Sequence, residues 1–487
     1  LPPQLTRYSL AQAMTWDGIR AIDYLETRPE VDRRRLGMFG NSGGGTQTAY
    51  VSAVDRRIRA AAPGNFITSY RRLLQTRGPQ DPEQYLYRQI ARGIDHADYL
   101  LARAPRPTLV VATTRDFFNI QGTRETAAEV QRAFALLGSP RNFALIEDDF
   151  EHGYTRKTRE ATYAFFQQHL GLPGSPADEN VELPAPAELQ VTPTGQVATS
   201  LGGESFSSVA RKTATPLFEA LAASRQNPAA HLGRVLEAAR GLSGYQAPVE
   251  TRGPIFAGRY QRNGYAVEKF MLEEEQEYPV PFLVFVPAGV GRHPGLIYLH
   301  PKGKAAQAGA GGEIEALVRA GHVVLAPDLA GIGETAPNSD AWEMAMLVGR
   351  SLVGLRAGDI VRLVRVLQAR PDVNPERIAG VARGETGAGL LHAAAFEPAL
   401  ARVALIESLV SYRALLEEEY FAARFGDEIV AHALIAYDLP DLAASLAPRP
   451  LIILHPQDGH GDRATADAVN RELAVVRRAY ASGPSEG

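Results

Sequence analysis

The segment RLGMFGNSGGGTQTAY, residues 35–50, decides how this chain is interpreted. A short apolar run ends at a serine that glycines flank, and a stretch of small residues follows it. Gly40, Ser42 and Gly44 satisfy G-x-S-x-G, the pattern in which a nucleophilic serine sits on a sharp turn from a strand into a helix. Such a turn tolerates no side chains beside the nucleophile, so the glycines favour this interpretation over a plain glycine turn. We predict that Ser42 is a nucleophile.

A serine hydroxyl attacks poorly unless a base removes its proton, so a histidine and an orienting acid should follow in the order Ser, Asp, His. Asp116 comes directly after the apolar run TLVVATTR, and His152 comes shortly after FALIE. Active sites of open α/β sheets lie at the carboxyl ends of strands, where these side chains can meet. We therefore predict Asp116 as the acid and His152 as the base, with the backbone N–H of Gly43 as one oxyanion donor.

Each of these residues also has a simpler interpretation. An aspartate after a strand is often only a helix cap, and a histidine in an acidic loop is often a surface residue. The carboxylates around His152 are expected to be solvated loop charges first, and substitutes for the orienting acid second; they are Glu147, Asp148, Asp149 and Glu151.

The sequence contains two copies of one pattern. DGIRAIDYLETRPEVDRRRLG, from Asp17, recurs as DIVRLVRVLQARPDVNPERIAG, from Asp359, and RAPRPTLVVATTRD is echoed by LAPRPLIILHPQD. Short apolar runs alternate with helix-length periodic segments, which predicts a mostly parallel sheet built from βα units in each copy. Only 41 residues precede Ser42 in the first copy, so we expect it to lack its early strands and the chain to be cut at both ends.

In the second copy the constant offset places Gly384 where Ser42 stands, so this copy offers no nucleophile at that turn. Thr386 lies two residues further on, in the following helix, and Asp458 matches Asp116, but no histidine corresponds to His152. His300 is expected to be an ordinary loop histidine. The second copy is therefore predicted to be non-catalytic.

Length and composition set the remaining limits. A chain of 487 residues is too long for one ordinary core, and we predict the C-terminal part of a catalytic domain over 1–172, a linker and helical segment over 173–250, and a second domain over 251–487. The net charge of −4 and strand-sized apolar runs point to no nucleic acid and no membrane span. The absence of cysteine excludes disulfides and thiolate ligands, and no metal or cofactor is expected.

The segments WDGIRAIDYLETRPEVD, GNSGGGTQTAY, RAPRPTLVVATTRDFF and EHGY resemble the α/β-hydrolase superfamily, in particular the two-domain bacterial acetylxylan esterase-like hydrolases related to prolyl oligopeptidases. The likeness covers most of 7–172 closely and 250–487 more loosely. It implies tandem α/β-hydrolase domains and the roles of nucleophile, acid and base for Ser42, Asp116 and His152. The motif GNSGGG departs from the G-C-S-R-x-G-K motif of glucuronoyl esterases.

The resemblance implies a serine esterase that acts on a small ester or acetylated carbohydrate, in the periplasm or outside the cell. A peptidase of the prolyl oligopeptidase type and a non-catalytic scaffold protein remain alternatives, because fold does not settle substrate. The sequence leaves the oligomeric state open.

Overall fold

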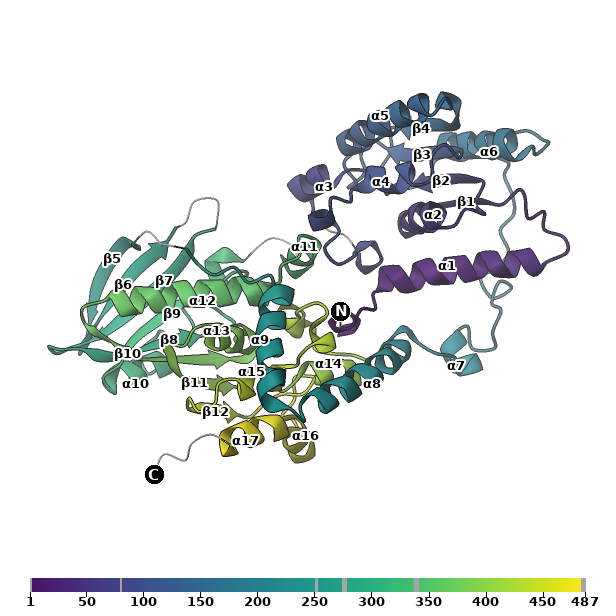
Figure 1. Cartoon of the computed structure of the whole chain (residues 1–487). Coiled ribbons are helices and arrows are strands. Elements are labelled where there is room, and N and C mark those ends of the chain that lie inside the picture. Colours follow the sequence, from purple (N-terminus) through teal and green to yellow (C-terminus); the bar gives the residue numbers. More distant parts are fainter. Residues whose placement is uncertain (1, 79–80, 250–252, 274–277, 337–340, 483–487) are drawn as a thin grey trace. The chain divides into compact units, whose positions relative to one another are not determined.

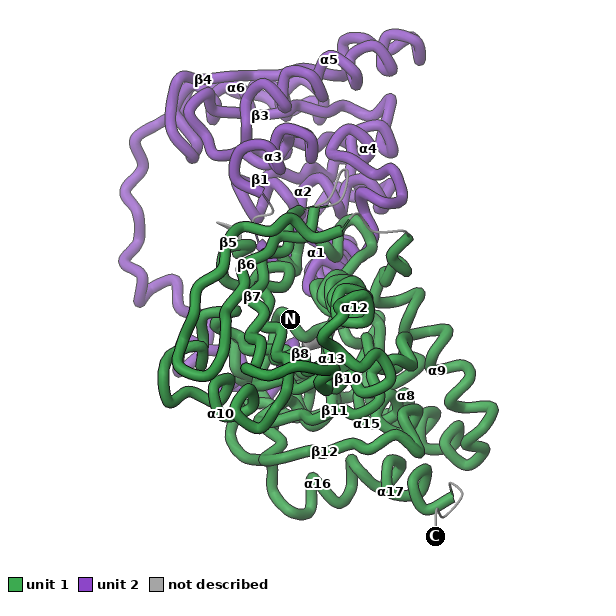
Figure 2. The backbone as a smooth tube through the Cα atoms, turned by 90° about the vertical axis from the view of Figure 1, so that its left-hand side faces the viewer, with its two compact units in different colours: residues 1–8, 207–487 green, residues 9–206 purple. Residues whose placement is uncertain are grey.

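The computed structural model describes residues 2–78, 81–249, 253–273, 278–336 and 341–482. The chain forms two compact units (Figure 2). We call residues 9–206 the elbow unit, and residues 1–8 with 207–487 the eight-stranded unit. The domain boundaries at 172 and 250 stay predictions.

The elbow unit contains one parallel sheet in the order β1-β2-β3-β4 (Figure 1). Its strands are β1 (Gly37–Asn41), β2 (Ala60–Gly64), β3 (Thr108–Thr113) and β4 (Phe143–Asp148). Its α-helices are α1 (Leu10–Thr27), α2 (Gly43–Val54), α3 (Tyr70–Thr76), α4 (His96–Leu101), α5 (Ile120–Leu136), α6 (Arg156–Leu170) and α7 (Val197–Leu201). Because all four strands are parallel, their carboxyl ends meet at one edge.

The two faces of this sheet bury alternate residues of the same strand. In β2, Ala60 and Ala62 pack in a cluster with Phe165 of α6, whereas Ala61 packs with Val51 of α2. Helices therefore cover both faces, as expected for a parallel sheet.

The eight-stranded unit has the strand order β12-β11-β10-β8-β9-β7-β6-β5. Its strands are β5 (Ile255–Arg262), β6 (Tyr265–Leu272), β7 (Val280–Pro287), β8 (His293–Leu299), β9 (Val323–Pro327), β10 (Val373–Arg383), β11 (Leu400–Ile406) and β12 (Leu451–Leu454). The pairs from β9 to β12 are parallel, and those that join β5, β6, β7 and β9 are antiparallel. The unit thus opens with antiparallel strands before its parallel part begins.

The helices of this unit are α8 (Phe206–Ser224), α9 (Pro228–Ser243), α10 (Glu313–Arg319), α11 (Ala341–Leu347), α12 (Leu352–Ala369), α13 (Gly387–Phe396), α14 (Tyr412–Glu417), α15 (Leu439–Ala444), α16 (Ala466–Glu472) and α17 (Ala474–Ala481). The largest core cluster joins strand residues such as Val284 and Leu325 to Ile360 and Leu363 of α12. Across the described ranges, none of the helices is both long and apolar enough to cross a bilayer.

The predicted fold class, mixed α/β with mostly parallel sheets, is confirmed in both copies. The elements that carry the duplicated pattern correspond: α1, β1 and α2 in the elbow unit match α12, β10 and α13 in the other. One strand was not predicted. The sequence of β2, AAAPG, has no β-branched or aromatic residue, and its strand conformation depends on burial between β1 and β3.

Candidate active site

Ser42 stands at the apex of the turn between β1 and α2. Its backbone has φ 58° and ψ −121°, where residues other than glycine are uncommon. Two glycines make the turn possible. A Cβ on Gly40 would lie 2.5 Å from the carbonyl oxygen of Gly44, and a Cβ on Gly45 would collide with the carbonyl oxygen of Gly64. Gly44 itself faces open space, so the packing constraint falls on positions 40 and 45.

Asp116 and His152 lie in contact beyond the ends of β3 and β4. The Nδ1 atom of His152 is 2.9 Å from Oδ1 and 2.8 Å from Oδ2 of Asp116. The side chain of Asp116 is 2% exposed and also accepts hydrogen bonds from Phe118 N–H and the Thr113 hydroxyl. The ring of Phe117 stacks on the imidazole at 4.4 Å. A carboxylate that accepts from Nδ1–H leaves Nε2 as the basic nitrogen.

Asn65 links the turn at Ser42 to the loop of His152. Its Nδ2 donates to Oδ1 of Asn41 at 2.8 Å and to the carbonyl oxygen of Gly153 at 2.7 Å. Within the described residues the Ser42 hydroxyl forms no hydrogen bond, including none to His152. Hydrogen bonds of this kind are often long without substrate and tighten only in the complex. The fold thus brings Asp116 and His152 together and places Ser42 at the same edge of the sheet.

The other acidic residues near His152 have different partners. Glu147 pairs with Arg124 at 2.6 Å, and this hydrogen bond lowers the pKa of the Glu147 carboxyl. Asp148 lies 3.6 Å from Lys157. Asp116 therefore contacts the imidazole, whereas Glu147 and Asp148 face other side chains, which supports Asp116 as the predicted orienting acid.

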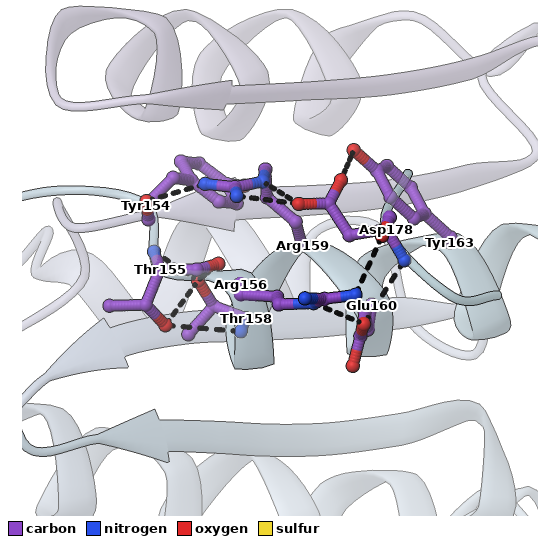
Figure 3. A network of polar contacts seen from close by, with 8 residues as sticks. All are labelled: Tyr154, Thr155, Arg156, Thr158, Arg159, Glu160, Tyr163 and Asp178. Atoms are coloured by element: carbon purple, nitrogen blue, oxygen red, sulfur yellow. Dashed lines mark hydrogen bonds and ion pairs between the residues drawn. The ribbon is translucent and has the colours of Figure 1, made fainter. Parts of the chain in front are cut away.

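The loop after His152 is fixed by its bonds to α6 (Figure 3). Thr155 and Thr158 exchange hydrogen bonds between hydroxyl and backbone N–H, which begins the helix. Arg159 donates to the carbonyl oxygen of Tyr154 at 3.0 Å and binds the carboxylate of Asp178 at 2.5 and 2.9 Å. This pair also anchors the start of the segment that was predicted to be a linker.

The predicted oxyanion donor, Gly43 N–H, is at the first residue of α2. A Cβ on Gly43 would lie 3.2 Å from Oε1 of Glu83, so this carboxyl group is next to the turn. Burial raises the pKa of Glu83, and the charge of Asp81 raises it further. No sequence motif marks Glu83, which stands in the short 3₁₀ helix Pro82–Gln84.

The second copy has the same turn with different chemistry. Gly384 follows β10 with φ 50°, close to the value at the serine of the first copy. Thr386 is fully buried, and its hydroxyl donates to the backbone carbonyl three residues before it. Glu385, next to this apex, pairs with Arg424 at 2.7 Å.

The other residues named in the second copy accept hydrogen bonds from nearby backbone N–H groups. Asp458 accepts from the backbone N–H groups of His460 and Asp462, both at 3.0 Å. His300 accepts from Lys302 N–H at 3.1 Å, and burial lowers the pKa of its imidazole. These positions form no acid–base pair with each other in the described part of the chain.

A serine, a histidine and an aspartate do meet in the eight-stranded unit, at residues that no sequence motif connects. Ser224 Oγ lies 3.0 Å from Nδ1 of His231, whose Nε2 lies 3.0 Å from Oδ1 of Asp441. Arg225 binds both carboxylate oxygens of Asp441, and Arg234 donates to Ser224 Oγ at 2.8 Å. The three residues lie in α8, α9 and α15, so their hydrogen bonds join these helices. Ser224 is the last residue of α8 and has no strained backbone like that of Ser42.

A protein-family model matches a stretch in the first part of the chain. Residues 8–96 match the family model acetyl xylan esterase (AXE1). A protein of Bacillus subtilis (strain 168), YtaP, for which a hydrolase activity is proposed, is 24% identical over 159 residues, which are 32% of this chain and 53% of that protein. The chain thus spans about half the length of this relative.

Solved structures of esterases are similar in part. A protein of Bacteroides fragilis NCTC 9343, proposed to be an acetyl xylan esterase, is 16% identical and has a TM-score of 0.46, with coverage of 58% of this chain and 80% of that one. The acetyl xylan esterase of Paenibacillus sp. R4 is 15% identical with a TM-score of 0.38, covering 51% and 84%. The family match confirms the resemblance stated from the sequence: over residues 8–96 this chain is similar to acetyl xylan esterases.

Proposed function

We propose that the elbow unit is a serine-dependent carboxylic ester hydrolase that works through an acyl-enzyme. The observation that supports this best is the contact of Asp116 with Nδ1 of His152, at the edge of the sheet where Ser42 adopts the strained turn. Buried carboxylate, imidazole and serine at three strand ends are the groups that acyl transfer requires.

In the proposed reaction, His152 Nε2 takes the proton from Ser42 Oγ while the oxygen attacks the acyl carbonyl. Asp116 holds the imidazole through Nδ1–H and stabilises its charged form. The imidazolium then protonates the departing alcohol, and the acyl group stays on Ser42. Water, activated by the same imidazole, attacks the acyl-enzyme and releases the acid and the free serine.

The backbone N–H of Gly43 would donate to the oxyanion of each tetrahedral intermediate. The carboxyl group of Glu83 lies close to this position, and burial raises its pKa. We assign Glu83 no step in the reaction.

For the substrate we propose an acetylated carbohydrate, and for the location the cell exterior or periplasm. The support is the match of residues 8–96 to the acetyl xylan esterase family. Among the described side chains, the geometry favours an ester or an amide substrate equally, because the same three groups serve both reactions.

The test is hydrolysis of p-nitrophenyl acetate by the full-length protein and its variants. Ser42→Ala and His152→Ala should each lower kcat by at least about a thousandfold, because triad residues act as a unit, and Asp116→Asn should be milder. Ser224→Ala, which removes the other serine paired with a histidine, should retain wild-type kcat. Full activity of a folded Ser42→Ala variant would show that the nucleophile is elsewhere.

A further inference from the structure

A cavity of about 670 Å³ lies at the amino-terminal ends of the strands in the elbow unit, the end opposite to Ser42. The loops before β1, β2, β3 and β4 and the end of α6 form its walls. Its lining includes six arginines and no carboxylate: Arg33, Arg34, Arg56, Arg57, Arg59 and Arg106.

Some of these charges are already held in place. Arg57 forms ion pairs of 2.5–2.8 Å with Asp55, Asp23 and Glu26. Arg106 donates to three backbone carbonyl oxygens, one at the end of α2 and two in the loop that follows it, at 3.1–3.4 Å. These bonds fix two guanidinium groups at the wall of the cavity.

Other charges there have no counter-ion. The side chains of Arg33, Arg56 and Arg59 form neither ion pairs nor hydrogen bonds within the described residues. The positive charges of Arg56 and Arg59 affect the pKa values of neighbouring groups. The pKa of Arg106 is lowered by burial and then by Arg56, and the pKa of His169 is lowered by burial and then by Arg59. The cavity therefore concentrates positive charge that its own residues leave uncompensated.

We propose that this cavity binds a ligand that carries two or more phosphate groups. The guanidinium fork matches phosphate oxygens in a bidentate way, and several arginines around one cavity favour an anion with several oxygens over a single carboxylate. A bound polyphosphate would supply the counter-charge that the side chains of Arg33, Arg56 and Arg59 lack within the described residues. The inference goes beyond the proposed ester hydrolysis, because it concerns the opposite end of the sheet.

Isothermal titration of the full-length protein with inorganic pyrophosphate at low salt tests this proposal, with citrate as the polycarboxylate comparison. The triple variant Arg33→Gln, Arg56→Gln, Arg59→Gln should weaken pyrophosphate binding at least about tenfold, since charged hydrogen bonds are the strong ones. The matched triple variant Arg71→Gln, Arg92→Gln, Arg132→Gln removes the same charge from exposed positions outside the cavity and should change binding less than about twofold.

Three results would overturn the proposal: no measurable binding of pyrophosphate, equal losses in the two triple variants, or tighter binding of citrate than of pyrophosphate. Circular dichroism of both variants checks that the fold is intact. The titration needs no esterase activity, so its outcome is independent of the proposed function.

Discussion

The backbone at Ser42 is strained, and its neighbours hold it there. A residue other than glycine with such a φ costs on the order of 1–3 kcal/mol. Ser42 N–H donates to the carbonyl oxygen of Gly64, and its own carbonyl accepts from Thr46 N–H, both at 2.9 Å. Gly384 adopts a similar φ in the other copy without this cost. The fold therefore makes the same turn twice and offers a hydroxyl only at the first.

Asn65 is expected to position the nucleophile relative to the base, because its two hydrogen bonds join the turn at Ser42 to the loop that carries His152. Asn65→Ala should lower kcat about ten- to a hundredfold, since small displacements of a nucleophile relative to its base are costly. Asn142→Ala is the control: it removes an amide that donates to Pro105 O at the opposite end of the sheet. If both variants hydrolyse p-nitrophenyl acetate like wild type, Asn65 does not position the site.

The residues of the candidate site differ in how far the sequence could predict them. Ser42, Asp116 and His152 follow strand ends in a fixed order, and order is visible in a sequence. Asn65 and Glu83 come close to them only through folding, from segments without a motif. The catalytic roles themselves stay predictions.

The two helices of the duplicated pattern, α1 and α12, differ in how deeply their equivalent residues are buried. In α12, Asp359 is fully buried, and it accepts a hydrogen bond from Tyr278 and pairs with Arg362. The equivalent Asp17 of α1 is exposed, and the equivalent arginine lies over the ring of Trp16. The pattern predicted both helices correctly, but burial depends on neighbouring elements that the repeat does not include.

A short 3₁₀ segment of the eight-stranded unit, Ala423–Glu428, ends at a buried carboxyl group. Glu428 accepts from Ala388 N–H of α13, and burial raises its pKa from an ordinary 4.5 to about 8. Between these two pH values the Glu428 carboxyl group is therefore protonated in the folded state and ionised in the unfolded chain. The contribution of Glu428 to the free energy of unfolding is fully present at low pH and is lost as the pH rises toward 8.

Glu428→Gln keeps an oxygen for the Ala388 N–H and does not titrate. The free energy of unfolding of the variant should therefore fall less than that of wild type between about pH 5 and pH 8, as measured by urea denaturation. Glu376→Gln, at an exposed position, should follow the wild-type pH dependence. Parallel curves for Glu428→Gln and wild type would contradict the assignment of a raised pKa.

At the scale of the whole molecule, the chain contains two related units with different prospects for catalysis. The eight-stranded unit has Gly384 at the apex of its turn, and its aspartate and histidine candidates are bonded locally. Its one serine–histidine–aspartate cluster in the described residues contains Ser224. There Arg225 binds the aspartate carboxylate, and Arg234 donates a hydrogen bond to the serine hydroxyl. We therefore predict that this unit is chemically silent.

Labelling of the full-length protein with a fluorophosphonate, followed by mass spectrometry of its peptides, tests whether Ser42 is the nucleophile, because the probe reacts with an activated serine. We predict one adduct per chain, on Ser42, and the loss of this adduct in His152→Ala. An adduct on Ser224, on Thr386 or on any other residue of the eight-stranded unit, or a Ser42 that stays unmodified in the folded protein, would contradict it.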